Sequence, residues 1–277
     1  YNTYITSYNA NMVANEVFID SATLRENVAS LARNVGYVPR SKKSAKAQVS
    51  FFVDTSNYTT APLTLTLKAG IVAVSNTFSS ENYSFAIMND VTVPVVNNIA
   101  EFTNVDIYEG SYLTKTFTYR ETGDNVPIEK FILPNDGIDT STIKVTVSPN
   151  STATNLKTVY KLTDNIIDVN NNSLIFLLQE AADEKYEILF GDGKFGKKLE
   201  DSNFINVHYI STNGKDANGV NSFTFTGNIQ DNSGVTVTEG ISLLTTIDSA
   251  RIGADIETVQ SIKKYAPLVY SAQNRAV

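Results

Sequence analysis

The feature that most constrains the fold is a change of hydrophobic period near residue 46. In residues 47–53, and again in 63–68, apolar and polar side chains alternate. A period of two places apolar side chains on one face of a strand and leaves the other face to water. Clusters of Asn, Asp and Gly, such as 135–137 and 213–214, separate further runs of this kind. We therefore expect a mainly β (α+β) fold built from antiparallel sandwich or meander units.

The expected strands are short and occupy much of the chain after residue 46. They comprise residues 47–53, 63–68, 83–88, 91–95, 105–108, 115–119, 143–147, 186–190, 204–210, 223–226 and 235–238. Only 18% of the residues are charged, and the polar content is chiefly Asn, Thr and Ser. This composition favours pleated surfaces over helices.

Helical patterns flank the expected strands. Residues 23–26, Thr-Leu-Arg-Glu, have the sequence of a capping box and begin an apolar stripe of helical period. Gly36 is expected to end this helix in a left-handed C-cap. A second helix is expected at about 255–265, with Asp255 as its N-cap and Pro267 as its stop.

These patterns predict four segments. They are a helical lead-in over 1–45, a first β unit over 46–110, a second β unit over 111–238 and a C-terminal helical segment over 239–277. The first residue is Tyr rather than Met, and the sequence ends directly after a helical pattern. We therefore expect an interior stretch of a longer protein.

Charge and composition exclude several functions from the prediction. The net charge of −7 argues against nucleic acid as a partner, because binding phosphates requires clustered Lys and Arg. The chain has no Cys, which excludes disulfides, thiol nucleophiles and Cys-ligated metals. No apolar run approaches the roughly 18 residues of a membrane span, so no membrane insertion is expected.

Three motifs suggest chemistry, and each has a simpler structural interpretation. His208 is the only histidine and lies in an expected strand, where a structural or exposed role is favoured over catalysis. Residues 168–172 resemble the opening of a calcium loop, but Ser173 replaces the required Gly, which favours an Asn-rich turn. The acidic residues between 180 and 187 are interpreted as a solvated loop. No catalytic residue, metal or cofactor is predicted.

Two further stretches predict structure or contacts. Asp192-Gly193 follows an apolar strand and favours a tight type I′ hairpin turn, because Asp-Gly tolerates positive φ. The basic stretch 40–46 stands out in an acidic chain. It is interpreted either as a docking site for an acidic surface or as a solvated connector.

Three separated stretches carry a family resemblance. Residues 31–40, 190–199 and 265–277 resemble the baseplate J-like family, and within it the wedge subunits of T-even, contractile-tail phage baseplates. The resemblance implies a late structural protein of the virion tail, assembled in the host cytoplasm, with no catalytic residues. It also implies a ring around the hub, formed by homodimers and by contacts with other wedge and hub proteins. The candidate interface residues are Arg40, Lys42, Lys43, Tyr270 and Arg275.

Two other functional classes stay open at the level of sequence. A carbohydrate-binding or adhesin-like β module would suit the Tyr, Asn and Thr content, and would require an aromatic platform on one sheet face. A carbohydrate-active enzyme would require two carboxylates roughly 5 to 9.5 Å apart in a cleft.

Overall fold

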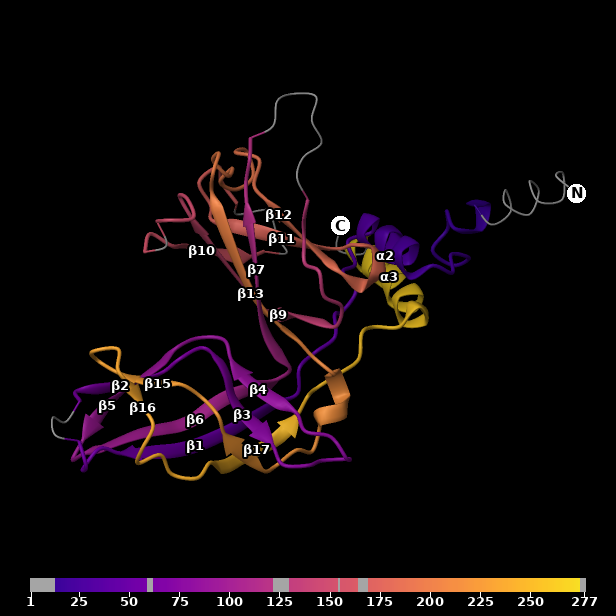
Figure 1. Cartoon of the computed structure of the whole chain (residues 1–277). Helices are drawn as coiled ribbons and strands as arrows, with labels where there is room; N and C mark the ends of the chain where they lie inside the picture. Colours follow the sequence, from indigo (N-terminus) through magenta and orange to yellow (C-terminus); the bar gives the residue numbers. More distant parts are fainter. Residues whose placement is uncertain (1–12, 59–61, 122–129, 154, 164–168, 275–277) are drawn as a thin grey trace, which may run out of the picture.

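The protein is mostly β. A computed structural model describes residues 13–58, 62–121, 130–153, 155–163 and 169–274, and Figure 1 shows its two sheets and a pair of helices. Strands make up 45% of the chain and helices 13%, and all strand pairs but one are antiparallel among the described residues, so the prediction of a mainly β fold is confirmed. The helical lead-in over 1–45 is not confirmed as a whole, because residues 1–12 lie outside the described residues.

A ten-stranded sheet forms what we call the first β unit. Its strands are β1 (Lys46–Asp54), β2 (Thr64–Leu67), β3 (Gly70–Ser75), β4 (Ser84–Ile87), β5 (Val91–Val96), β6 (Ile99–Glu109), β14 (Phe223–Phe225), β15 (Ile229–Asp231), β16 (Thr236–Val237) and β17 (Thr245–Arg251). The order is β14-β3-β4-β6-β5-β2-β15-β16, and β1 pairs with both β6 and β17. The alternating residues of β1 point into a buried core that contains the stacked rings of Phe51 and Phe102.

A seven-stranded sheet forms the second β unit. Its strands are β7 (Ser111–Thr118), β8 (Phe131–Ile132), β9 (Ile138–Ser148), β10 (Thr158–Leu162), β11 (Ile175–Glu180), β12 (Tyr186–Phe190) and β13 (Phe204–Ser211). The order is β7-β13-β9-β10-β11-β12-β8, with β10 and β11 parallel and the other pairs antiparallel. Its core is separate from the first, and Phe131 lies edge-on to Phe117 and Phe190 within it.

The second β unit is inserted into the first. Strands β14 to β17 follow the second unit in sequence but pair with strands of the first sheet. The predicted segments instead placed residues 212–238 with the second unit, and the strand pairing groups these residues differently. The physical reason is that strand partners are chosen by nonlocal packing, which a pattern along the chain does not reveal. Short 3-10 helices, η1 (Ala182–Glu184) and η2 (Gly214–Ala217), lie in connections.

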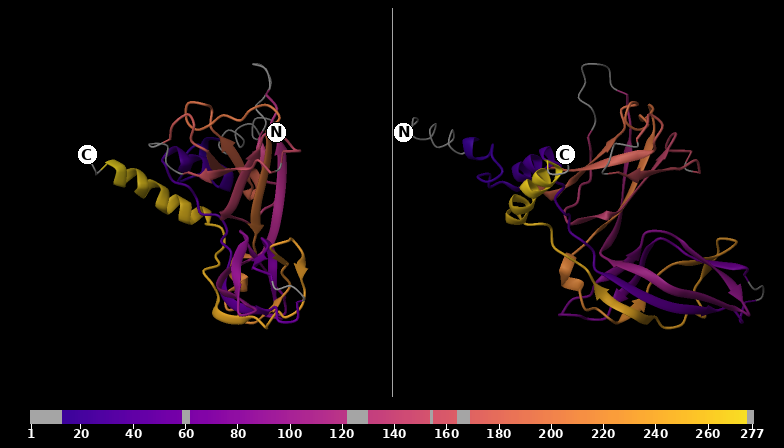
Figure 2. Two further views of the ribbon diagram at one scale, coloured as in Figure 1. Left: turned by 90° about the vertical axis from the view of Figure 1, so that its left-hand side faces the viewer. Right: turned by 180° about the vertical axis from the view of Figure 1, so that it is seen from behind.

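Two helices pack together beside the second β unit, away from most of the first (Figure 2). They are α2 (Arg25–Asn34) and α3 (Val259–Asn274), which we call the helix pair. Val28 and Ala32 of α2 share a small buried core with Ile262 and Ala266 of α3. The helix pair therefore joins segments from opposite ends of the described chain.

The predicted capping box of α2 is wrong. The N-cap residue is Leu24, one position later than expected, and it has no side-chain cap. The Glu16 carboxylate instead accepts the backbone N–H groups of Thr23 (2.8 Å) and Leu24 (3.3 Å), as well as the Thr23 hydroxyl (2.6 Å). A carboxylate at this end of a helix also interacts favourably with the helix dipole.

The C-terminus of α2 turns at Gly36. This residue has φ 81°, its N–H donates to Arg33 O, and the N–H of Tyr37 donates to Ala32 O. This pair of hydrogen bonds is a Schellman motif. The predicted stop of α3 is wrong, because Pro267 lies inside the helix and α3 begins at Val259 rather than near Asp255. The buried contacts of α3 with α2, at Ile262 and Ala266, lie directly before Pro267.

Candidate functional site at the junction of the units

Connections between the units meet at one junction. Residues 42–44, 212–214 and 252–255 lie against one another, and Lys43 and Ala254 exchange two backbone hydrogen bonds of 2.9 and 3.0 Å. The direct connection from β6 to β7 is the single residue Gly110. The first β unit, the second β unit and the helix pair are therefore all joined through a small volume.

The Glu109 carboxylate ties two of these connections together. Glu109 ends β6 and is only 1% exposed. It accepts hydrogen bonds from the Thr212 hydroxyl, from Asn213 N (3.2 Å) and from Asn213 Nδ2 (3.0 Å), all in the segment that follows β13. Burial raises the pKa of this carboxyl group, while the hydrogen bonds and Lys42 act in the opposite direction.

The Asp139 carboxylate makes a similar connection from β9. It is 2% exposed and accepts Ser44 N–H at 2.8 Å, from the segment that leads into β1. Its other oxygen accepts the N–H and the hydroxyl of Ser141, at 3.0 and 2.6 Å. Several donors offset the cost of burying a carboxylate, so Asp139 can anchor this connection.

The Glu257 carboxylate binds the helix pair to the junction. It accepts hydrogen bonds from Tyr37 Oη (2.7 Å), Arg40 N (3.0 Å) and Ser261 Oγ (2.6 Å). Burial raises the pKa of Glu257, but these hydrogen bonds outweigh burial and the net pKa is lowered. Burial and the bond to Glu257 raise the pKa of Tyr37 to about 12.

Arg25 links α2 to both neighbours. Its Nε lies 2.7 Å from Glu180 Oε1 at the end of β11, and its guanidinium also donates to Glu257 O. The Glu180 side chain is 5% exposed, so this carboxylate is not the solvated loop residue that the sequence suggested. The reason is that α2 packs over the end of β11 and covers it.

The candidate interface residues of the basic stretch lie at this junction. The Arg40 guanidinium is 3.7 Å from the Glu257 carboxylate, and Lys43 bonds Ala254 through its backbone. The Lys42 side chain lies beside Gly137 and Gly214. These contacts are intramolecular, so the docking role of Arg40, Lys42 and Lys43 stays a prediction. Tyr270 belongs to α3, but its side chain lies outside the described part of the chain, as does the whole of Arg275.

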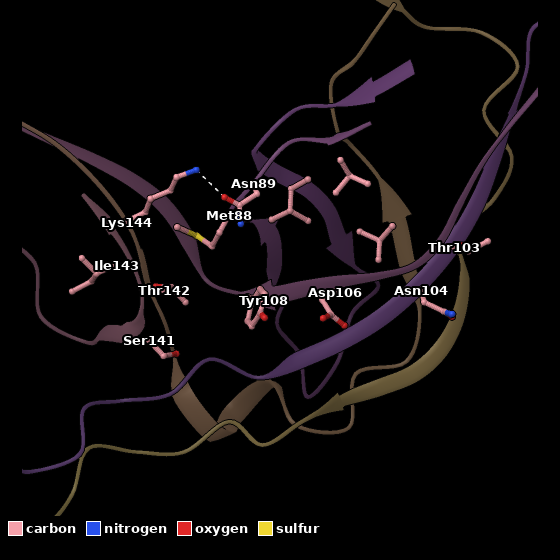
Figure 3. Close-up of a pocket in the computed structure, with 13 residues that line it drawn as sticks. Met88, Asn89, Thr103, Asn104, Asp106, Tyr108, Ser141, Thr142, Ile143 and Lys144 are labelled. Atoms are coloured by element: carbon pink, nitrogen blue, oxygen red, sulfur yellow. Dashed lines mark hydrogen bonds between the residues drawn. The ribbon is translucent and has the colours of Figure 1, made fainter. Parts of the chain in front are cut away.

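A groove of about 630 Å³ opens between the two β units, next to the junction (Figure 3). Its first-unit wall includes Asn89, Asp106 and Tyr108, and its second-unit wall includes Ser141 and Lys144. The Lys144 ammonium donates to Asn89 Oδ1 across the groove at 2.7 Å. Asp106 is already engaged by the Lys46 ammonium (2.8 Å) and by Gln48 Nε2 (3.1 Å). The lining is therefore a mixture of apolar and polar side chains, and Asn89, Asp106 and Lys144 are paired within the protein.

His208 lies on the outer face of β13. Its Nδ1 is 2.9 Å from Thr114 Oγ1, and its ring stacks on Tyr112 at 5.7 Å between centroids. Burial lowers the pKa of His208, and Lys144 and Lys157 lower it further. These neighbours favour a neutral ring that fills space on the sheet surface.

The Gly-rich segment after β12 is a closed loop, and the predicted tight hairpin is wrong. Strands β12 and β13 are not neighbours in the sheet, because β9, β10 and β11 lie between them. Gly193 has φ 89°, and Asp192 Oδ1 accepts the N–H groups of Lys194 (2.9 Å) and Phe195 (2.8 Å). Hydrogen bonding to the backbone lowers the pKa of Asp192. The local turn was detectable from Asp-Gly, but the strand pairing was not.

This loop also packs against the Asn-rich turn that resembled a calcium loop. Gly196 N–H donates to Asn170 O at 3.0 Å, and Lys197 N–H donates to Ser173 O at 2.8 Å. Asn170 Oδ1 accepts Asn172 N–H at 2.9 Å. Asp168, the first residue of that turn, lies outside the described residues.

The described residues contain neither a cluster that could hold a metal ion nor a helix that could span a membrane. No group of three or more His, Asp or Glu side chains in the described part of the chain could hold a metal ion. Within that same part, neither helix combines the length and the apolar character needed to cross a bilayer.

The fold and the junction define a mainly β protein in which an inserted β unit and a helix pair are held by buried carboxylates. No protein-family model matches the chain. The chain is similar to the baseplate wedge protein gp6 of Enterobacteria phage T4, with 23% identity over 295 aligned residues. The alignment covers 100% of this chain and 42% of the relative, so the chain spans less than half of the relative's length. This distant homology supports a baseplate wedge-like relationship, and the baseplate J-like family is not confirmed.

Proposed function

We propose that this chain is a structural subunit of a contractile-tail phage baseplate wedge and catalyses no reaction. In this proposal it forms a ring around the hub through homodimers and through contacts with other wedge and hub proteins. It is assembled in the host cytoplasm and resides in the tail of the virion. The observation that carries the proposal is the similarity to a baseplate wedge protein along the whole chain.

The junction supports a scaffolding role. Buried carboxylates use most of their hydrogen-bonding capacity on neighbouring connections, as Glu109, Asp139 and Glu257 do. Such groups hold segments in place rather than react with a substrate. These contacts hold the connections between the units together, which a scaffolding role requires.

The segment division remains part of the proposal. We propose that the segments 1–45, 46–110, 111–238 and 239–277 make different contacts in the assembled baseplate. Residues 223–251 belong to the last two of these segments but pair with the first sheet. Cross-linking of purified baseplates with mass spectrometry tests the division. Cross-links from the four segments to different neighbours support it, and cross-links from all four segments to the same neighbours contradict it.

The direct test of function is purification of tagged protein from infected host cells. We expect it to co-purify with other tail proteins, and a map of isolated baseplates should contain both β units in a ring. A tagged non-tail protein from the same cells serves as the control. Infectious particles whose purified tails lack the protein would contradict the proposal. Specific binding on a glycan array, without tail association, would favour the carbohydrate-binding alternative.

A further inference from the structure

We propose that the crossing of the connections at Gly110 and at Thr212–Gly214 is a hinge between the β units, and that the Glu109 carboxylate is its latch. Opening the latch changes the width of the groove that Figure 3 shows between the units. The hinge follows from the geometry of this chain and does not depend on the proposed function.

The two β units are built to move as separate bodies. Their buried cores have no residue in common, and each sheet closes its own hydrophobic cluster. Contacts between the two units include those of β7 with β3 and β4 and the exposed hydrogen bond from Lys144 of β9 to Asn89. Units joined by small, polar interfaces are expected to move relative to each other.

The connection at Gly110 packs against the end of β13 so closely that only glycine fits. Gly110 has φ 129°, and a Cβ atom on it would lie 2.4 Å from Ser211 O and 2.5 Å from Ile210 Cγ2. Gly214, with φ 75°, lies at the other side of the crossing. Rotation between the units must therefore pass through these few residues, which is how hinges absorb large changes of φ and ψ.

Glu109 holds this crossing closed. Its carboxylate extends from the last residue of β6 and bonds Thr212 and Asn213, which lie directly after the last residue of β13. The same group thus joins the end of the first unit to the end of the second. Without it, the buried hydroxyl group of Thr212 would need another acceptor, and water can supply one only if the crossing opens, whereas Asn213 is exposed.

The groove lies where such a rotation has most effect. Tyr108, next to Glu109, lines one wall, and Lys144 of β9 lines the other. The hydrogen bond from Lys144 to Asn89 is exposed, so it resists opening only weakly. The position of the walls therefore depends mainly on buried bonds, which are those of Glu109 and the bond from Ser44 N–H to Asp139.

The absence of Cys makes the hinge accessible to spin labelling. Thr103→Cys on β6 and Thr116→Cys on β7 are exposed positions on different units, and Thr103→Cys with Ser249→Cys is a reference pair within the first unit. Distance distributions are measured by double electron–electron resonance in the otherwise unchanged chain, in Glu109→Gln and in Thr212→Val. Glu101→Gln, on the same strand and exposed, is the matched control.

We expect Glu109→Gln and Thr212→Val each to broaden the distribution of distances between the labels on the two units about twofold or more. The reason is that domains move relative to each other once their interface loosens. The reference pair and the Glu101→Gln control should stay unchanged. Unchanged distributions between the units in both folded variants would overturn the latch. Equal broadening of the reference pair would also overturn it, because the first β unit itself would then have loosened.

Discussion

Individual glycines in this protein serve two distinct physical purposes. Gly193 supplies a positive φ of 89° and has open space, with only Lys198 Cβ 3.6 Å from a built Cβ. Gly191 instead allows close approach, because a Cβ atom there would lie 2.3 Å from the backbone of Gly196. The cost of adding a side chain should therefore differ between two residues of the same loop.

Gly193→Val should lower the free energy of unfolding by about 1–2 kcal/mol, because a branched residue is strained at positive φ. Gly191→Val should cost more, since the loop backbone must also move apart. Urea unfolding followed by circular dichroism compares the two variants. A Gly191→Val protein as stable as Gly193→Val would contradict the distinction.

Glu16 gives the start of α2 a dependence on pH. Hydrogen bonds from the Thr23 hydroxyl, then from Asn27, lower its pKa from 4.5 to about 2. A lowered carboxyl pKa stabilises the folded state above the unfolded pKa, and this stabilisation disappears as pH falls through the folded pKa. The contribution should therefore be lost between pH 4.5 and about 2.

Carboxyl-detected NMR should find the titration midpoint of Glu16 near 2, with loss of order at the start of α2 over the same range. Glu16→Gln should remove this transition and leave α2 frayed at neutral pH. A Glu16 midpoint at the ordinary value of 4.5 would show that the non-local cap does not form in solution.

At the scale of elements, β9 connects the second sheet to the junction. It pairs with both β13 and β10, and its second residue is Asp139. Thr142 and Thr146 are both buried threonines of β9, and their hydroxyl groups differ in hydrogen bonding. The Thr142 hydroxyl donates to Asp139 O (2.7 Å) and accepts Ile210 N–H (3.1 Å), whereas Thr146 Oγ1 finds no partner among the described residues.

Thr146→Val should raise the free energy of unfolding by about 1 kcal/mol, because it replaces an unsatisfied buried hydroxyl with a methyl group of similar shape. The matched change Thr142→Val should lower it by about 1–2 kcal/mol, because it leaves a buried N–H without an acceptor. Chemical denaturation measures both variants. Equal changes of the same sign in the free energy of unfolding of the two variants would contradict the difference in hydrogen bonding between Thr142 and Thr146.

At the scale of the whole molecule, exposed apolar residues occur on both β units and also on and near the helix pair. Val17, Phe18 and Leu24 precede or begin α2, and Tyr265 and Leu268 lie on α3, all with more than a third of their surface exposed. The low charged fraction of 18% leaves few groups to keep such surfaces apart. This supports the proposal that copies of the chain associate.

Analytical ultracentrifugation at micromolar concentration should detect a dimer, whose contact should bury roughly 1,200 Å² or more. The double change Phe18→Ser with Leu268→Ser should weaken it at least about tenfold, since two aromatic or aliphatic anchors are lost. Leu243→Ser, 92% exposed on the first β unit, is the control and should leave the dimer intact. A protein that stays monomeric throughout would remove the physical support for self-association.

Local patterns in the sequence determined the mainly β class, most of the strand positions and the turn at Gly36. These features depend on neighbouring residues, because side-chain alternation and positive φ are properties of a few consecutive positions. For the same reason, the Asp-Gly turn was recognisable while its role in a hairpin was not. Strand β12 was predicted with the bounds that the structure shows, Tyr186–Phe190.

The tertiary structure alone decided which segments meet. Strands β14–β17 pair with the first sheet, Glu16, seven residues before Thr23, replaces the expected capping box, and Pro267 lies inside α3. The tertiary structure also brought Glu109 and Glu257 to one junction with the basic stretch, although no local pattern marks either residue. Pairing, register and burial depend on contacts between residues far apart in the chain, and the free energy of packing outweighs local propensity there.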